Sequence, residues 1–440
     1  MRSSIRAGLT GIALALMPIQ AVAAEPVSPS VAPERVATRE AAPSPAPKSA
    51  LPTLRTASLA ADCARLESQI ESGALAVENG KTNAACIKPG GKGEVTARDL
   101  SALADRTPVP LPDYCYDLAT GDGTWWYTRT DACAISVWTL NVVDVRTGRL
   151  TGQLSYIQAD LLYTGADAPY WAHQVAIDKT DGWGTIGGTT VSGGGTCTGA
   201  CTLASGDIDF PSQPVNDTGL AFGDILPKTT VTAAGAKGEG RTKVNYRFAN
   251  PTWTVQPLGV TTEPPFNVRC DNAVPGTTAV GCVVPAYPAV HVVSLTGRNP
   301  NYARHIQEAQ TSGLPGAYPN GQPLRRLTDA TNRDKNGDTA CPQFADGGYP
   351  RPTGYSCDEY PFRSTWQGAY TGSVGQPTPY PGRTFSWCQI SALSSRVGPN
   401  GWSACMIPVS ENSSGGSLLN RFYIDNRVIE NDPFYVWITT

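Results

Sequence analysis

The sequence carries little charge. Only 16% of its 440 residues are charged, and the formal net charge is −3. A chain so close to neutral is not an obvious nucleic-acid binder as a whole, because such binding needs a strongly basic surface. The many glycines (45) and prolines (37) favour short strands and turns over long helices. The length allows two or three domains.

Long apolar runs are absent except at the N-terminus. Arg2 and Arg6 precede the apolar residues 7–19, and small residues at 21–24 offer a cleavage site. This pattern predicts a secretory signal peptide over residues 1–24, and the run is too short to span a membrane. No other apolar stretch approaches 18 residues, so we expect no stable membrane insertion. The expected location is extracellular, and the signal style and low lysine content favour a bacterium.

Histidine is also scarce, with only His173, His291 and His305. The CxxxC at 197–201 therefore has no partner at zinc spacing, and a small disulfide loop is the better interpretation. We expect His173 and His291, in strand-like surroundings, to be structural. Twelve cysteines in a chain with a secretory start predict disulfides. They fall into six consecutive pairs, although spacing alone cannot prove the connectivity: Cys63–Cys86, Cys115–Cys133, Cys197–Cys201, Cys270–Cys282, Cys341–Cys357 and Cys388–Cys405.

Composition and pattern divide the remaining chain into four parts. Residues 25–57 are Pro/Ala-rich and cannot bury enough apolar surface to order, so we expect a disordered linker or pro-segment. Residues 58–106 contain one helical pattern and predict a small helical segment. Residues 107–297 read as strand after strand, which predicts an antiparallel β-sandwich-like domain. Residues 298–440 mix helices and strands, and their 11 Arg and one Lys against 11 Asp and Glu give a net charge of +1.

Two adjacent carboxylates, Asp358 and Glu359, lie in a predicted strand, where they would point to opposite faces. A second strand is predicted at 403–409, and a last strand ends the chain. Residues 411–417, with their Gly415-Gly416 pair, are expected to form a turn that opens a helix near Asn412, with Ser413 or Ser414 as its cap. This is the element order of ββα-metal nucleases, whose first strand carries a general base and whose helix carries a metal-binding side chain, often Asn. An ordinary solvated acidic pair is the alternative interpretation of Asp358-Glu359.

Four short motifs make the order more specific. They are HI at 305–306, CDEYPF at 357–362, ENSSGGSLL at 411–419 and DPFYV at 432–436. In these motifs the chain resembles the NucA/NucB family of secreted bacterial deoxyribonucleases. The resemblance covers about a third of the chain, from about residue 304 onward, and leaves the upstream 300 residues uncovered. A long insertion after residue 362 departs from the compact members.

The resemblance implies metal-dependent hydrolysis of DNA phosphodiester bonds with little sequence preference. It implies that Asp358 is the general base, replacing the usual histidine, and that Glu359 supports it as a second ligand or an orienting group. Asn412 would bind Mg²⁺ or Mn²⁺ through oxygen, with Glu411 as a further candidate ligand. His305 matches in position and is expected to be structural.

Candidates for contacting the DNA substrate are Arg351, Arg421 and Asn420, since a guanidinium suits bidentate phosphate contacts. The β-rich domain would then be a cell-surface, targeting or inhibitory module whose partner the sequence does not identify. A second hypothesis is a disulfide-rich secreted surface or binding protein with an inactive nuclease-like domain. A glycosidase ranks last, because adjacent residues on opposite faces of a strand cannot easily flank one bond.

Overall fold

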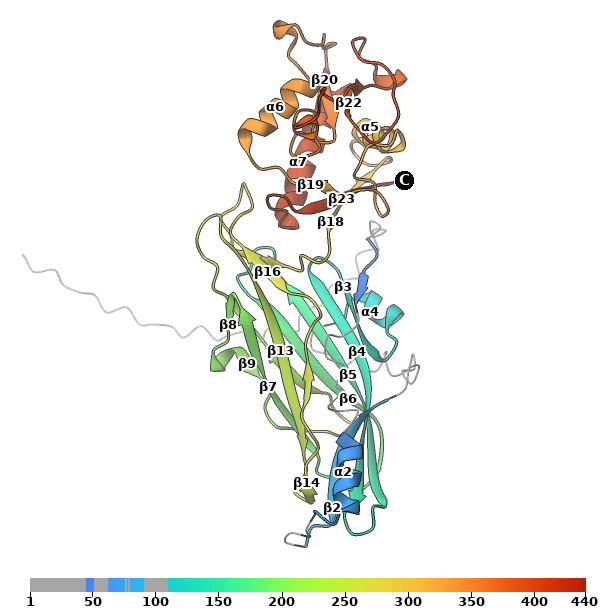
Figure 1. The fold of residues 1–440 in the computed structure, drawn as a ribbon, viewed down its shortest axis with the longest axis vertical. Coiled ribbons are helices and arrows are strands. Elements are labelled where there is room, and N and C mark those ends of the chain that lie inside the picture. The colour runs from blue at the N-terminus through green and yellow to red at the C-terminus, as the bar shows by residue number, and fades with distance from the viewer. Residues whose placement is uncertain (1–44, 51–61, 76, 78–79, 91–109) are drawn as a thin grey trace, which may run out of the picture. The chain divides into compact units, whose positions relative to one another are not determined.

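The computed structural model describes residues 45–50, 62–75, 77, 80–90 and 110–440 (Figure 1). The predicted signal peptide and most of the predicted linker lie outside these residues. The fold is mainly β, as predicted, with antiparallel sheets in the N-terminal part and a mixed α+β region in the C-terminal part. In the described part of the chain, no helix is long and apolar enough to cross a membrane.

The N-terminal part contains two large sheets. The first has the order β1 (Lys48–Ala50), β3 (Asp122–Tyr127), β4 (Asp131–Asp144), β5 (Leu150–Thr164), β6 (Trp171–Gly184), β11 (Ala221–Ile225) and β9 (Ile208–Asp209), with β2 (Asn83–Pro89) beside β4 and β14 (Trp253–Val255) beside β2. The second has the order β10 (Gln213–Pro214), β7 (Thr190–Gly199), β13 (Lys237–Ala249), β16 (Val268–Asp271) and β17 (Gly281–Val283), with β15 (Val260–Thr262) beside β13. A two-stranded ladder joins β8 (Cys201–Thr202) to β12 (Lys228–Thr229).

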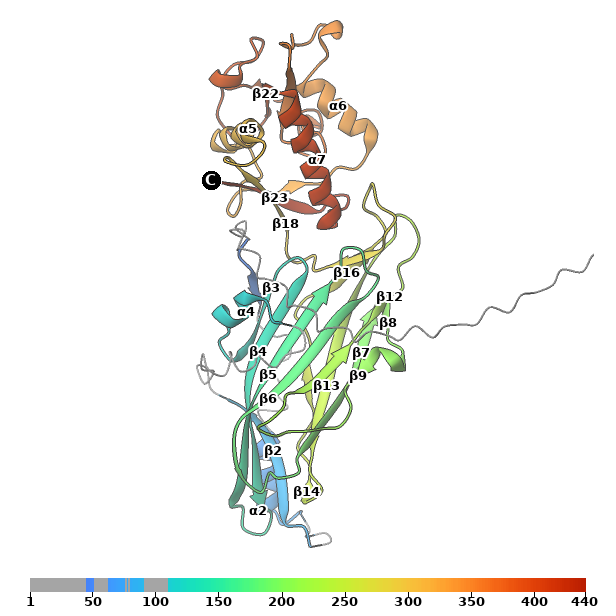
Figure 2. The same cartoon turned by 180° about the vertical axis from the view of Figure 1, so that it is seen from behind.

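Alternation of side chains makes these sheets a sandwich. Every second residue of β13 is buried, including Val244, Tyr246 and Phe248. They share one apolar cluster with Tyr156 of β5 and Ile177 of β6, so the inner faces of the two sheets meet there. The aligned strands of both sheets can be followed in Figures 1 and 2.

Disulfides fasten the shorter elements to this framework. The Cys63–Cys86 bridge joins α2 (Asp62–Glu71) to β2, and the Cys115–Cys133 bridge joins α4 (Asp113–Leu118) to β4. All six bridges link consecutive cysteines, in the pairs that the sequence suggests: Cys63–Cys86, Cys115–Cys133, Cys197–Cys201, Cys270–Cys282, Cys341–Cys357 and Cys388–Cys405.

The C-terminal region has two small sheets and three helices. One sheet has the order β18 (Ala289–Ser294), β23 (Pro433–Thr439) and β19 (Leu324–Arg325), and the other has β20 (Tyr355–Tyr360), β22 (Trp402–Pro408) and β21 (Gly382–Arg383). The helices are α5 (Pro300–Thr311), α6 (Ala330–Ala340) and α7 (Val409–Asp425). The predicted order of strand, strand, helix and strand is therefore present as β20, β22, α7 and β23.

One strand is paired differently from the sequence expectation. Residues 289–294, assigned above to the β-rich domain, form β18, which pairs in parallel with the C-terminal strand β23. Its alternating residues Ala289, His291 and Val293 are buried. Local alternation predicts a strand, but it does not say which distant strand is the partner.

Helix α7 begins at Val409, earlier than the predicted start at Ser413 or Ser414. The Gly415-Gly416 pair, which resembles a turn in the sequence, lies inside the helix. A Cβ atom at Gly415 would lie 2.7 Å from the ring of Tyr302 on α5. The glycine is therefore explained by the close approach of two helices and not by a turn.

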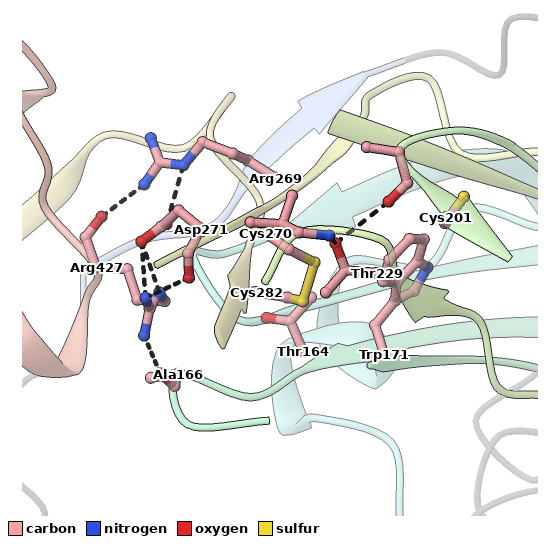
Figure 3. The surroundings of a disulfide bond; sticks show 12 residues. Thr164, Ala166, Trp171, Cys201, Thr229, Arg269, Cys270, Asp271, Cys282 and Arg427 are labelled. Carbon is pink, nitrogen blue, oxygen red and sulfur yellow. Dashed lines mark hydrogen bonds and ion pairs between the residues drawn. A yellow bond between two sulfur atoms is a disulfide. The ribbon is translucent and has the colours of Figure 1, made fainter. Parts of the chain in front are cut away.

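Ion pairs with buried arginines join the β-rich part to the C-terminal region. Arg427, just after α7, donates from Nη2 to Asp271 Oδ1 at 2.7 Å and to Asp271 O at 2.6 Å (Figure 3). In return, Arg269 Nη1 and Arg129 Nη2 lie 2.7 and 3.1 Å from Asp432 Oδ2. Each side thus supplies a carboxylate to the arginines of the other.

Backbone strain accompanies this contact. Arg427 has φ 46°, in the left-handed region where a helix commonly ends with glycine. Its side chain is fully buried and also donates to the carbonyls of Ala166 and Ala279. These contacts explain why a large residue holds a position that glycine would occupy with less strain.

We predict that Arg427→Met lowers the free energy of unfolding by about 3–5 kcal/mol, because it removes the hydrogen-bonded cation of the buried Asp271 carboxylate and leaves it only the longer 3.4 Å contact with Arg269. Urea unfolding followed by fluorescence measures the loss. Arg421→Ala is the control: among the described residues Arg421 pairs with Asp425 on the same exposed helix face, so its loss should be far smaller. Equal losses in the two variants would contradict the interpretation.

A second prediction concerns His291, which is buried with Nε2 lacking a hydrogen-bond partner and packs 4.9 Å from the ring of Phe422. Burial lowers the pKa of His291 to about 4. Above pH 6.5 the imidazole is neutral in both states, whereas between pH 6.5 and 4 only the unfolded chain binds the proton. Acidification from pH 7 to 5 should therefore cost about 2 kcal/mol through this residue.

His291→Phe should remove that part of the pH dependence, which urea unfolding at pH 7 and pH 5 measures. The carboxylates titrate alike in both proteins, so the comparison isolates the imidazole. Parallel stability curves for wild type and variant would show that the folded protein tolerates the protonated ring.

Candidate functional site

Strand β20 and helix α7 border a cavity of about 350 Å³. Strand β20 pairs antiparallel with β22, and α7 follows β22 without a loop, so the acidic pair and the first turns of α7 come together. Figure 2 shows α7 beside β22. The cavity is lined by Tyr302, Arg326, Arg333, Cys357, Asp358, Glu359, Phe362, Arg363, Ser364, Asn412, Gly416, Leu419, Asn420 and Tyr423.

Both predicted acids border this cavity, although successive residues of a strand point to opposite faces. Strand β20 lies at the edge of its sheet, as the proline after it suggests. Side chains from both faces of an edge strand can reach the same space. Asp358 is buried and Glu359 is partly exposed.

Asp358 is held by a histidine that sequence analysis assigned a structural role. His305 Nδ1 on α5 lies 2.6 Å from Asp358 Oδ2, and His305 Nε2 lies 2.9 Å from Ser403 Oγ. The Ser403 hydroxyl in turn donates to Tyr360 O at 3.2 Å. The histidine thus fixes the orientation of Asp358 and links it to β22.

Glu359 has a strongly shifted protonation equilibrium. Burial, and next the negative charge of Asp358, raise the pKa of Glu359 to about 8, while Arg363 opposes the shift. Without a bound cation the carboxyl group is therefore mostly neutral at pH 7. A group of this kind becomes a strong ligand when a cation replaces its proton.

Asn412 is fixed in one orientation. Its Nδ2 donates to Ser356 Oγ and to Cys357 O, both at 3.0 Å. The amide nitrogen is therefore occupied by β20, and the amide oxygen is left for another partner.

The donors around the cavity suit a hard cation. Glu359, Asp358 and Asn412 offer oxygen only, which favours Mg²⁺ or Mn²⁺ over zinc. Mg²⁺ commonly uses one or two carboxylates and completes its shell with water and substrate phosphate. In the part of the chain that the structure describes, no group of three or more His, Cys, Asp or Glu gathers to form an all-protein metal cage. The residues present fit a shared metal–phosphate site of the first kind.

Glu411 lies elsewhere. Its carboxylate accepts from Asn301 N and Asn301 Nδ2, both at 2.7 Å, and it does not line the cavity. Those bonds satisfy a free N–H at the start of α5. The structure therefore gives Glu411 a helix-anchoring contact in place of the predicted metal contact.

Only one of the three predicted substrate contacts lines the cavity. Asn420 does, one helical turn from Gly416. Arg351 donates to Cys341 O at 2.9 Å, and Arg421 pairs with Asp425. Arg351 and Arg421 thus contact partners outside the cavity.

Three other arginines, missed by sequence analysis, line the cavity: Arg326, Arg333 and Arg363. They lie before α6, on α6 and after β20, so no local spacing joins them. The arginine-rich composition of residues 298–440 was the one signal available, and it does not single out positions. The two acids of β20 thus line the same cavity as guanidinium groups from separate segments of the chain.

Comparison with known families bears on this region. The family model Deoxyribonuclease NucA/NucB matches residues 319–437, which include β20, β22 and α7. The comparisons with curated proteins and with solved structures found no match. Cavity-lining residues other than Tyr302 fall inside the matched range, and the motif acids and Asn412 converge there. Residues 319–437, in the C-terminal part of the chain, are a NucA/NucB deoxyribonuclease domain.

Proposed function

We propose that the chain is a secreted, metal-dependent endonuclease that hydrolyses DNA phosphodiester bonds with little sequence specificity. The observation that carries this proposal is the convergence of Asp358, Glu359 and Asn412 with three arginines around one cavity of the nuclease domain. Phosphodiester hydrolysis needs a base for the attacking water and positive charge around the phosphate. The cavity offers both.

Asp358 acts as the general base. One of its oxygens is held by His305, and its residue borders the cavity where a water can sit. The carboxylate takes a proton from that water as the water oxygen attacks phosphorus. His305 keeps the carboxylate in place through its second bond to Ser403, which limits the motion needed on reaction.

Asn412 and Glu359 would hold the divalent cation, Mg²⁺ or Mn²⁺. A divalent cation bound there would supply charge stabilisation at the phosphate and at the leaving oxygen. Asn412 is pre-oriented by β20, and Glu359 would bind the cation through its ionised carboxylate. Glu411 stays with Asn301 and supports the packing of α5 against the start of α7.

Weak sequence preference follows from the kinds of contact that the cavity allows. Carboxylate-bound cations and guanidinium groups contact phosphates, which carry no base sequence directly. The six disulfides suit an oxidising, extracellular environment. The β-rich part then accompanies the nuclease outside the cell, as a targeting or inhibitory module.

The proposal predicts plasmid nicking that requires Mg²⁺ or Mn²⁺ and stops with EDTA. Asp358→Asn should lower the cleavage rate at least about a hundredfold, because the amide cannot take the proton. The amide can still accept from His305, so the thermal unfolding midpoint should change little. Normal cleavage by this variant would refute the base assignment, and a wild-type protein inert with every metal would refute the nuclease proposal.

A separate prediction tests the metal ligand. Asn412→Ala should raise the metal concentration for half-maximal cleavage at least about tenfold, with rescue at high metal. Glu411→Gln is the matched neighbour control, and its metal requirement should stay at the wild-type value. The reverse pattern, with Glu411→Gln shifted and Asn412→Ala unchanged, would exchange the two assignments.

A further inference from the structure

The cavity is bordered by a buried cation, Arg326, that forms no ion pair with a described residue. Arg326 is only 3% exposed, and no carboxylate among the described residues lies within ion-pair distance of it. Its Nη1 donates to Leu327 O and Ser364 O at 3.2 and 3.3 Å, and its Nε has no partner within the described structure. A guanidinium cannot shed its proton in a protein, so Arg326 keeps its charge without a carboxylate in direct contact among the described residues.

The other buried arginines are treated differently. Arg129, Arg269 and Arg427 each contact an aspartate. Arg383 has no carboxylate, but it donates to four oxygen atoms at distances from 2.5 to 3.1 Å. Arg326 is the member of this group that borders the cavity and has two long carbonyl contacts. Burying a cation in this way is costly unless an anion arrives to pair with it.

A second guanidinium repeats the pattern. Arg333, on α6, lines the same cavity, and its buried Nε also has no hydrogen-bond partner among the described residues. Burial lowers the pKa of Arg326, and the Arg333 charge adds to this effect, while Tyr423 and the Glu430 carboxylate oppose it. Arg326 and Arg333 thus line one cavity, and neither forms an ion pair with a described residue. Arg363 differs, because it already pairs with Asp334.

Arg326 is held rigidly. Its guanidinium carbon lies 3.8 Å from the ring centroid of Tyr423, and the Tyr423 hydroxyl lies 2.9 Å from Ser364 Oγ. The ring and the two carbonyls fix the plane of the fork before any ligand binds. Tyr423 is thus a positioning residue for Arg326.

We infer that Arg326 and Arg333 form the subsite for the phosphate group that is cleaved, in the cavity that Asp358 and Glu359 also line. The identity of the anion as a nucleic-acid phosphate rests on the proposed function, whereas the anion site itself does not. Arg326, fixed in advance, stabilises the negative charge that gathers on the phosphate oxygens in the transition state. Arg333, on the more exposed helix, contributes mainly to substrate affinity.

The first test measures binding without catalysis. Inorganic phosphate is titrated into the full chain in EDTA, and the thermal unfolding midpoint is followed. We expect a saturating increase for wild type, an affinity at least tenfold weaker for Arg333→Ala, and a similar loss for Arg326→Lys. Arg325→Ala is the matched control, since Arg325 is adjacent and exposed and donates instead to Asn431 O; its phosphate affinity should equal that of wild type.

Wild-type phosphate affinity in Arg333→Ala and Arg326→Lys, or a midpoint that phosphate leaves unchanged in wild type, would overturn the subsite. If Arg326→Lys fails to fold, Arg333→Ala still decides, because this helix position is only partly buried.

The second test measures cleavage. Arg326→Lys should lower kcat about 10²–10³-fold, as for loss of one oxyanion donor, in addition to the weaker binding expected with inorganic phosphate. Arg333→Ala should raise KM and reduce the slope of log affinity against log salt by about one. Unchanged kcat in a folded Arg326→Lys protein would remove its catalytic role. A wild type that binds phosphate but cleaves no DNA refutes the proposed function alone, so the two failures are distinguishable.

Discussion

The reciprocal pairing of Arg427 with Asp271, and of Asp432 with Arg129 and Arg269, is the constraint on which the C-terminal region depends. Arg427 and Asp432, the two residues that the nuclease domain contributes to these ion pairs, lie in the short connection between α7 and β23. That connection sets where α7 ends and where β23 begins. Since α7 carries Asn412 and Asn420 at its other turns, the β-rich part contributes to the position of the candidate site through a rigid helix.

A second consequence follows from how these charges are arranged. At the junction, the buried arginines Arg129, Arg269 and Arg427 each contact an aspartate of the protein itself. In the cavity, Arg326 and Arg333 line the same space as Asp358 and Glu359, and no ion pair joins them. The arginines at the junction are therefore paired within the protein, whereas the cavity arginines Arg326 and Arg333 form no ion pair with a described residue. A cavity lined by both acids and unpaired arginines suits a substrate that brings its own anion together with a cation.

Sequence reasoning was strongest where the chemistry is local. Asp358-Glu359 and Asn412 lie in short motifs, and the strand, strand, helix order that unites them could be read along the chain. Arg326 and Arg333 could not be found in this way, because burial and the lack of a partner are properties of the folded state. His305 was underestimated for a similar reason: its bond to Asp358 spans 53 residues. Gly415-Gly416 was misread as a turn, since only the contact with Tyr302 shows why glycine is needed inside α7.

The pairing of β18 with β23 could not be predicted from the sequence, and it affects where the nuclease domain can be cut. The family match begins at residue 319, but β18 and α5 lie before it. A fragment cut at that boundary would lose His305, the partner of Asp358, and it would strip one neighbour from β23. The unpaired N–H and C=O groups of β23 would then form an open, largely apolar sheet edge, the usual starting point for intermolecular β-pairing. Similarity to the family therefore defines a shorter unit than the one whose backbone hydrogen bonds are complete.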